Sequence, residues 1–172
     1  LSNLPVPDYS LLPLERYSYE LMGKNFMLFE MSRGCPFNCI YCLKKMYGKK
    51  YRLKSVKSLG KEVETAVKKF EIKNAYFIDL EMTVNKKHVA ELCNFLINKK
   101  IKLSWCCQTR ADTVDFELLK KMRKAGCLLI HYGVETGSPR IMKFIEKKIT
   151  HEQILNGVRL AHKAGIETAC FF

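Results

Sequence analysis

The sequence has no long apolar run, no signal-peptide pattern and few acidic residues. No stretch of it approaches the ~18 to 20 apolar residues that a membrane-spanning helix needs. Its N-terminus lacks the basic, apolar and small-residue order of a secretory signal, so we expect a cytoplasmic protein. The length of 172 residues excludes a large multidomain assembly and leaves room for one domain of ordinary size.

The shortage of acids makes the chain strongly basic. Lysine and arginine number 30 against 17 acidic residues, which gives a formal net charge of +13. Such a balance suits an anionic partner, so a nucleic acid is possible. It is not favoured, because most lysines fall in pairs that predict solvated helix faces: Lys68/Lys69, Lys99/Lys100, Lys120/Lys121 and Lys147/Lys148.

The two ends of the chain predict a piece of a longer protein. The first residue is Leu1 rather than Met, and the last three are Cys170, Phe171 and Phe172, as if the chain were cut inside a strand. Residues 1–22 contain three of the five prolines, which predicts an extended lead-in packed on a domain surface. Residues 23–172 are then the core domain.

Strand-like and helix-like segments alternate along that domain. Apolar runs predict strands at 26–31, 75–80, 103–107, 128–134 and 166–172, and helical periodicity predicts helices at 59–70, 89–97, 116–125, 141–145 and 154–164. This alternation predicts parallel strands joined by right-handed crossovers. A doubly wound sheet and a (β/α) barrel both fit, and both place an active site at the carboxyl ends of the strands.

Three cysteines follow the first predicted strand at C-x3-C-x2-C spacing: Cys35, Cys39 and Cys42. Thiolates in one short loop can converge on one metal centre. A structural zinc wants four ligands, and no further Cys or His lies nearby in the sequence. A four-iron cubane held by three thiolates keeps one iron open for a substrate or cofactor. An iron–sulfur cluster is therefore favoured, with zinc and a disulfide as open alternatives.

The segment from Arg33 to Cys42, RGCPFNCIYC, resembles the signature of the radical S-adenosylmethionine (radical SAM) superfamily. Further segments follow in the order typical of that superfamily: Phe77-Ile78-Asp79, Arg110-Ala111-Asp112, Met122 to Cys127, and Gly133 to Ser138. Together with the Leu4-Pro5-x-Pro7 lead-in, they most resemble the branch whose members often carry an N-terminal cobalamin-binding domain.

The resemblance implies an α/β fold, a partial (β/α)6 TIM-like barrel truncated after the start of the fifth strand. It also implies a [4Fe–4S] cluster held by the three cysteines, with SAM chelating the open iron. Reductive cleavage of SAM to a 5′-deoxyadenosyl radical would then serve hydrogen abstraction or radical methylation of a substrate that the sequence does not identify. An electron donor such as flavodoxin or ferredoxin would supply the electron, and cobalamin would bind a domain outside this chain.

Two other functions compete with this interpretation. Within the enzymes, an RNA-modifying radical SAM methylthiotransferase suits the basic charge. From another class, a zinc-stabilised nucleic-acid-binding module would also account for the charge and the clustered cysteines, but not for the missing fourth ligand.

Polar residues at alternate strand positions are expected to face the lumen of the barrel, because helices cover the outside. On the third strand these are Ser104, Cys106, Gln108 and Arg110, and on the fourth they are His131 and Glu135. Such a lumen suits a polar ligand. The role of His131 stays open, and the five other cysteines are expected to be structural.

The resemblance also implies which residues contact SAM. Asp79, or else Glu81, lies where the family contacts the SAM amine, and Asp79 is preferred. Arg110 is expected at the SAM carboxylate, and Glu135 and Ser138 at the ribose or methionine part. Phe37 and Tyr41 of the cysteine loop are further expected cofactor contacts. The alternative for Asp79 and Glu135 is a structural ion pair with Arg110 or Arg33.

Overall fold

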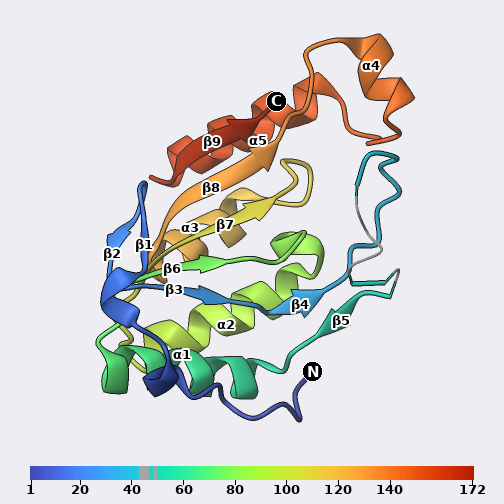
Figure 1. The fold of residues 1–172 in the computed structure, drawn as a ribbon. Helices are drawn as coiled ribbons and strands as arrows, with labels where there is room; N and C mark the ends of the chain where they lie inside the picture. Colours follow the sequence, from blue (N-terminus) through green and yellow to red (C-terminus); the bar gives the residue numbers. More distant parts are fainter. Residues whose placement is uncertain (43–46, 49) are drawn as a thin grey trace.

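A computed structural model describes residues 1–42, 47–48 and 50–172 of the chain. Its centre is a five-stranded parallel sheet whose strands lie side by side in chain order (Figure 1). The strands are β3 (Phe26–Phe29), β6 (Asn74–Phe77), β7 (Ser104–Thr109), β8 (Cys127–Gly133) and β9 (Glu167–Phe171). This sequential parallel order confirms the predicted α/β class and its partial barrel.

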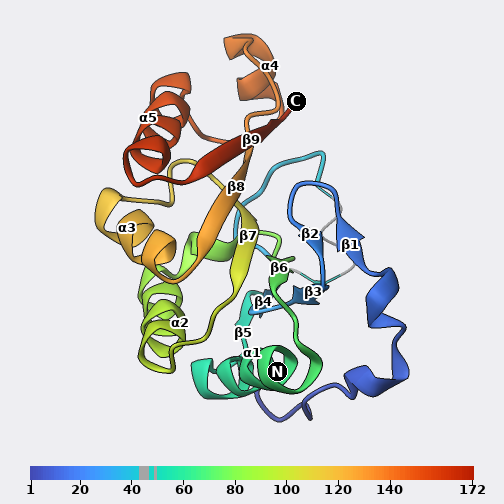
Figure 2. The same cartoon turned by 90° about the vertical axis from the view of Figure 1, so that its left-hand side faces the viewer.

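Helices cover one face of this sheet. They are α1 (Val56–Phe70), α2 (Lys86–Asn98), α3 (Phe116–Lys124) and α5 (His151–Lys163), with the short α4 (Pro139–Phe144) beyond the carboxyl end of β8 (Figure 2). Side-chain caps begin the long helices, for example Ser55 before α1 and Asp115 before α3. No helix within the described residues is long and apolar enough to cross a membrane.

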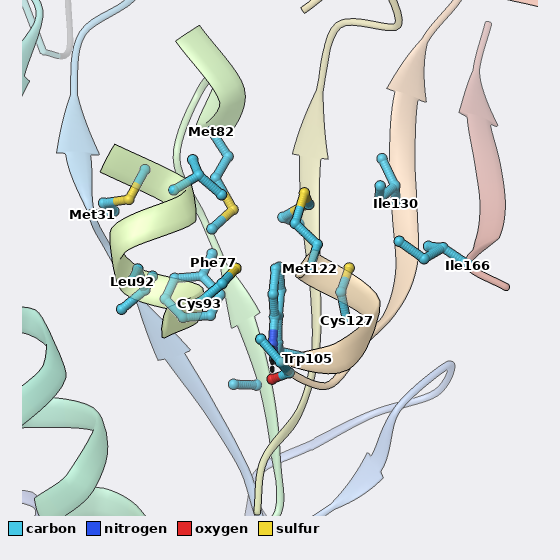
Figure 3. Packing of buried hydrophobic residues seen from close by; sticks show 14 of the residues in the cluster. Met31, Phe77, Met82, Leu92, Cys93, Trp105, Met122, Cys127, Ile130 and Ile166 are labelled. Carbon is cyan, nitrogen blue, oxygen red and sulfur yellow. Dashed lines mark hydrogen bonds between the residues drawn. The ribbon is translucent and has the colours of Figure 1, made fainter. Parts of the chain in front are cut away.

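The apolar core lies between the helices and the outer face of the sheet. Phe77 of β6 packs edge-on against Trp105 of β7, with ring centroids 5.2 Å apart, in the same cluster as Leu92 and Met122 (Figure 3). The Trp105 indole donates a hydrogen bond to the carbonyl of Ala125 at 2.8 Å, so its one polar group is satisfied in the core.

The lead-in is more folded than the prolines predicted. Residues 1–22 contain two short 3-10 helices, η1 (Tyr9–Leu11) and η2 (Leu14–Arg16), and the strand β1 (Ser18–Tyr19), which pairs antiparallel with β2 (Gly23–Lys24). The hairpin therefore crosses the predicted boundary at residue 22. Its position opposite the helices lets the lead-in cover the inner face of the sheet (Figure 2).

A second small pair of strands brackets the cysteine loop. The strand β4 (Ser32–Arg33) pairs antiparallel with β5 (Arg52–Leu53). Between them, Gly34 adopts φ +86°, and a Cβ there would meet the carbonyl of Lys50 at 2.5 Å. Only glycine fits this turn, which starts the cysteine loop at the carboxyl end of β3.

Candidate cofactor site

One pocket gathers the cysteine loop and the carboxyl ends of three neighbouring strands. Its described lining consists of Cys35, Phe37, Cys39, Tyr41 and Cys42 from the loop; Leu80 and Glu81 after β6; Gln108, Thr109 and Arg110 from β7; His131, Gly133 and Glu135 from β8; and Lys147 and Phe171. This is the edge of the sheet where parallel α/β folds place their ligands. The three cysteines and five of the seven other predicted cofactor residues therefore meet in one place.

The cysteine loop is fastened to the connection between α4 and α5. The backbone N–H of Ile40 donates to the carbonyl of Ile145 at 3.1 Å, and that of Cys42 donates to the carbonyl of Cys39 at 3.4 Å. All three thiols are partly exposed toward the pocket. The loop thus holds its thiols at the surface of the pocket rather than in the core.

The donor set of this loop fits a [4Fe–4S] cluster. Among the described residues, no three Cys, His, Asp or Glu side chains converge closely enough for a single ion. A cubane does not require such convergence, because each thiolate binds a different iron. The structure joins none of the described cysteines in a disulfide. Three thiolates around one pocket thus suit a cluster better than a closed four-ligand zinc site.

Asp79, the preferred contact for the SAM amine, does not line this pocket. It is fully buried, and its two carboxylate oxygens accept hydrogen bonds from the backbone N–H of Met31 at 3.1 Å and the hydroxyl of Ser32 at 2.5 Å. Burial raises the pKa of Asp79 to about 6, against the lowering effect of these donors. The structure corrects the preference: Asp79 ties the end of β6 to the start of the cysteine segment.

Glu81, the other candidate, does line the pocket. Its Oε1 accepts hydrogen bonds from three threonine hydroxyls: Thr109, Thr113 at 3.0 Å and Thr83 at 3.2 Å. Burial raises the pKa of Glu81, while these donors oppose the rise. The threonines hold a carboxylate in a fixed orientation beside the cysteines, which favours Glu81 for a cationic ligand group.

Arg110 faces the pocket but is largely engaged by the protein itself. Its guanidinium forms a bidentate pair with Asp112 at 2.9 and 2.8 Å and donates to the carbonyls of Lys147 at 2.7 Å and Lys148 at 3.3 Å. It also lies over the ring of Phe37 at 4.0 Å from the centroid. The predicted alternative of an ion pair with Asp79 or Glu135 is therefore not formed, because Asp112 takes that place.

Glu135 pairs with a lysine that the sequence did not single out. The Nζ atom of Lys147 lies 2.7 Å from Glu135 Oε1 and 3.4 Å from the hydroxyl of Tyr41. Burial, followed by the neighbouring Glu135, raises the pKa of Tyr41. The prediction of a solvated Lys147 is wrong: it is only 4% exposed, whereas Lys148 is exposed. The run Glu146-Lys147-Lys148 contains no local signal for this burial.

Ser138 and His131 complete the predicted set. Ser138 does not line the pocket; it is the N-cap of α4, and its hydroxyl accepts from the N–H of Ile141 at 3.4 Å. His131 does line it, on the inner face of β8. Its ring stacks on Tyr76 and Phe171, with centroids 5.2 and 5.5 Å away.

Comparison with known families matches residues 29–172 to the radical SAM superfamily. The chain belongs to this superfamily of enzymes. Members use a [4Fe–4S] cluster and SAM, which decides between the alternatives for the cysteine loop in favour of the cluster.

Two curated relatives and one solved structure resemble the chain over most of its length. An uncharacterized methyltransferase of Pyrococcus horikoshii is 34% identical over 167 residues, which is 96% of this chain and 36% of that protein. The anaerobic magnesium-protoporphyrin IX monomethyl ester cyclase of Rubrivivax gelatinosus is 30% identical over 168 residues, 96% of this chain and 30% of that protein. The cobalamin-dependent SAM radical enzyme OxsB superimposes with a TM-score of 0.77 and 26% identity, over 83% of this chain and 23% of that one.

Proposed function

We propose that this chain is the SAM-cleaving core of a larger cobalamin-dependent radical SAM methyltransferase. The observation that carries the proposal is the single pocket, in which three thiols from one loop face Glu81 and Glu135 from two separate strand ends. The chain spans about a third of the length of the relatives it matches, 36% and 30%. Methyl transfer and cobalamin are supported by the names of the Pyrococcus relative and of OxsB.

The residues of the pocket divide the work of holding the cofactors. Cys35, Cys39 and Cys42 would ligate three irons of a [4Fe–4S] cluster, which supplies the electron for reductive cleavage of SAM when it receives one from a donor such as flavodoxin or ferredoxin. Glu81, already oriented by its threonines, accepts hydrogen bonds from the SAM amine.

The other SAM contacts come from the neighbouring strand ends. Glu135 accepts a hydrogen bond from the ribose. Arg110 has four of its five N–H donors engaged by described residues, so its remaining donor is directed to the SAM carboxylate. Phe37 and Tyr41 line the pocket beside the cysteines and exclude water from it.

Anaerobic reconstitution with iron and sulfide tests the cluster. We expect about four irons per chain, and loss of the cluster when Cys35, Cys39 or Cys42 is replaced by Ala. Cys170→Ser is the matched control, because Cys170 is exposed on β9 and lies outside the pocket lining. Reduction with dithionite in the presence of SAM should then yield 5′-deoxyadenosine. Iron that survives loss of Cys39, or stoichiometric zinc in protein purified without oxygen, would contradict the proposal.

A further inference from the structure

Lys147 occupies an unusual position for a lysine. It lies in the connection between α4 and α5, buried to 4% exposure between two exposed neighbours, Glu146 and Lys148. Those neighbours adopt φ +53° and +52°, in the left-handed region that non-glycine residues seldom occupy. The backbone therefore twists on both sides of Lys147 in a way that turns this one ammonium inward. Strain of this kind persists only where the surrounding contacts enforce it.

The ammonium joins two separate parts of the pocket. It lies 2.7 Å from the carboxylate of Glu135, after β8, and 3.4 Å from the hydroxyl of Tyr41, inside the cysteine loop. The same connection contacts that loop a second time, through the carbonyl of Ile145, which accepts from Ile40 N–H. Tyr41 stands directly before the third cysteine, so its position sets where Cys42 lies.

The backbone of the same residue serves the third strand end. The carbonyls of Lys147 and Lys148 both accept hydrogen bonds from Arg110, which in turn lies over Phe37 of the cysteine loop. One short connection thus holds the loop at Ile40, Tyr41 and, through Arg110, at Phe37. A buried lysine that only stabilised the fold would need its carboxylate partner but not these contacts to the loop.

Space for the pair is provided by a glycine. A Cβ on Gly133 would lie 2.5 Å from Glu135 Oε1 and 2.5 Å from Lys147 Nζ. The backbone of Gly133 does not require glycine, because its φ lies outside the left-handed region. The missing side chain therefore serves the ion pair.

We infer that Lys147 is a positioning residue of the cofactor site: its ammonium couples Tyr41 of the cysteine loop to Glu135, so that the cluster ligands and a SAM-contacting carboxylate keep one arrangement. This inference rests on the proposed function. It gives the chain a fixed positive charge next to the site of an anionic cluster, and it makes Gly133 a determinant of the geometry without any contact to a ligand.

Gly133→Ala tests the inference without removing any charged group. The new methyl group must displace the ends of two flexible side chains, so the fold survives while the pair moves. Gly137→Ala is the matched control, since a Cβ there meets nothing within 4 Å. We expect reconstituted Gly133→Ala to keep its iron content and melting temperature but to bind SAM about tenfold or more weakly in equilibrium dialysis, while the control binds as the wild type does.

Lys147→Met and Glu135→Gln provide the second measurement. If the pair acts as a unit, each single variant weakens SAM binding, and the double variant binds no more weakly than the weaker single one. Lys148→Met, at the exposed neighbour, should leave binding unchanged.

The outcomes separate this inference from the proposed function. Wild-type protein that does not load a cluster or bind SAM overturns both. Wild-type binding with unchanged SAM affinity in Gly133→Ala and Lys147→Met overturns the inference alone, and a lowered melting temperature in those variants would then assign the pair to folding. Additive losses in the double variant would also overturn the coupling.

Discussion

The two faces of the parallel sheet differ in what satisfies them. On the outer face, Phe77, Trp105 and Tyr132 are fully buried beneath the chain's own helices. On the inner face, Gln108 and His131 turn toward a pocket that the loops and the lead-in only partly fill. The outer face is thus completed by local crossovers, whereas the inner face carries polar groups whose partners include a ligand.

The lead-in hairpin closes part of the inner face. Tyr19 of β1 stacks on Tyr76 with centroids 5.8 Å apart, and its hydroxyl lies 3.1 Å from His131 Nε2. The other ring nitrogen, Nδ1, is 3.4 Å from the carbonyl of Cys107, which can only accept a hydrogen bond. Nδ1 therefore carries the proton in the neutral ring, and Tyr19 donates to Nε2. An aromatic layer separates the cofactor pocket from the other end of the lumen.

Truncation of the largest outer-face side chain should have the largest effect on stability. Trp105→Ala is expected to lower the free energy of unfolding by about 3 to 5 kcal/mol, because the cavity lies under packed helices. Gln108→Ala, on the neighbouring inner-face position, removes one hydrogen bond from Tyr76 and should cost about 1 kcal/mol. Urea unfolding of both variants measures this, and equal losses would break the distinction between the faces.

Asp79 should make the outer region sensitive to pH. Its folded pKa of about 6 lies above the ordinary value of 3.8, so between these values the folded state binds more protons than the unfolded state. The stability of the wild type relative to Asp79→Asn should therefore fall by about 3 kcal/mol as pH rises from about 4 to 6. Urea unfolding at several pH values measures the difference. A difference that is constant with pH would contradict the assignment.

Glu81, only two positions later, should act on the ligand instead. Glu81→Gln removes the charge that faces the SAM amine and should weaken SAM binding by about 10- to 150-fold, which corresponds to about 1.5 to 3 kcal/mol. Asp79→Asn is the control and should bind SAM as the wild type does. Equilibrium binding to the reconstituted variants, with melting followed in parallel, distinguishes the two carboxylates. Reversed effects would restore Asp79 as the amine contact.

The smallest expected effect concerns the junction of the lead-in with the lumen. Burial lowers the pKa of His131 below 6.5. Tyr19→Phe removes a donor that stabilises the neutral ring, so the pKa of His131 should rise by less than about one unit. An NMR titration of the imidazole measures it, with Tyr17→Phe as a control on an exposed tyrosine. A further decrease of the pKa would show that Tyr19 accepts rather than donates.

Much of the architecture was predictable because its signals are local. Apolar periodicity located all five strands of the sheet and the helices between them, and the cysteine spacing identified the family. The short pairs β1–β2 and β4–β5 were missed, since two-residue strands have no periodicity to detect. The threonines around Glu81 were missed as well, because they come from separate segments of the chain.

The sequence by itself determined the alternation of strands and helices, the glycine turn and the three-cysteine loop, because each depends on residues close together in the chain. The tertiary structure alone decided between Asp79 and Glu81: β6 ends at Phe77, so strand parity no longer predicts where later side chains point. It also buried Lys147 in a run of charges that appears solvated. That burial depends on Glu135 and Tyr41, which only folding brings to the same place.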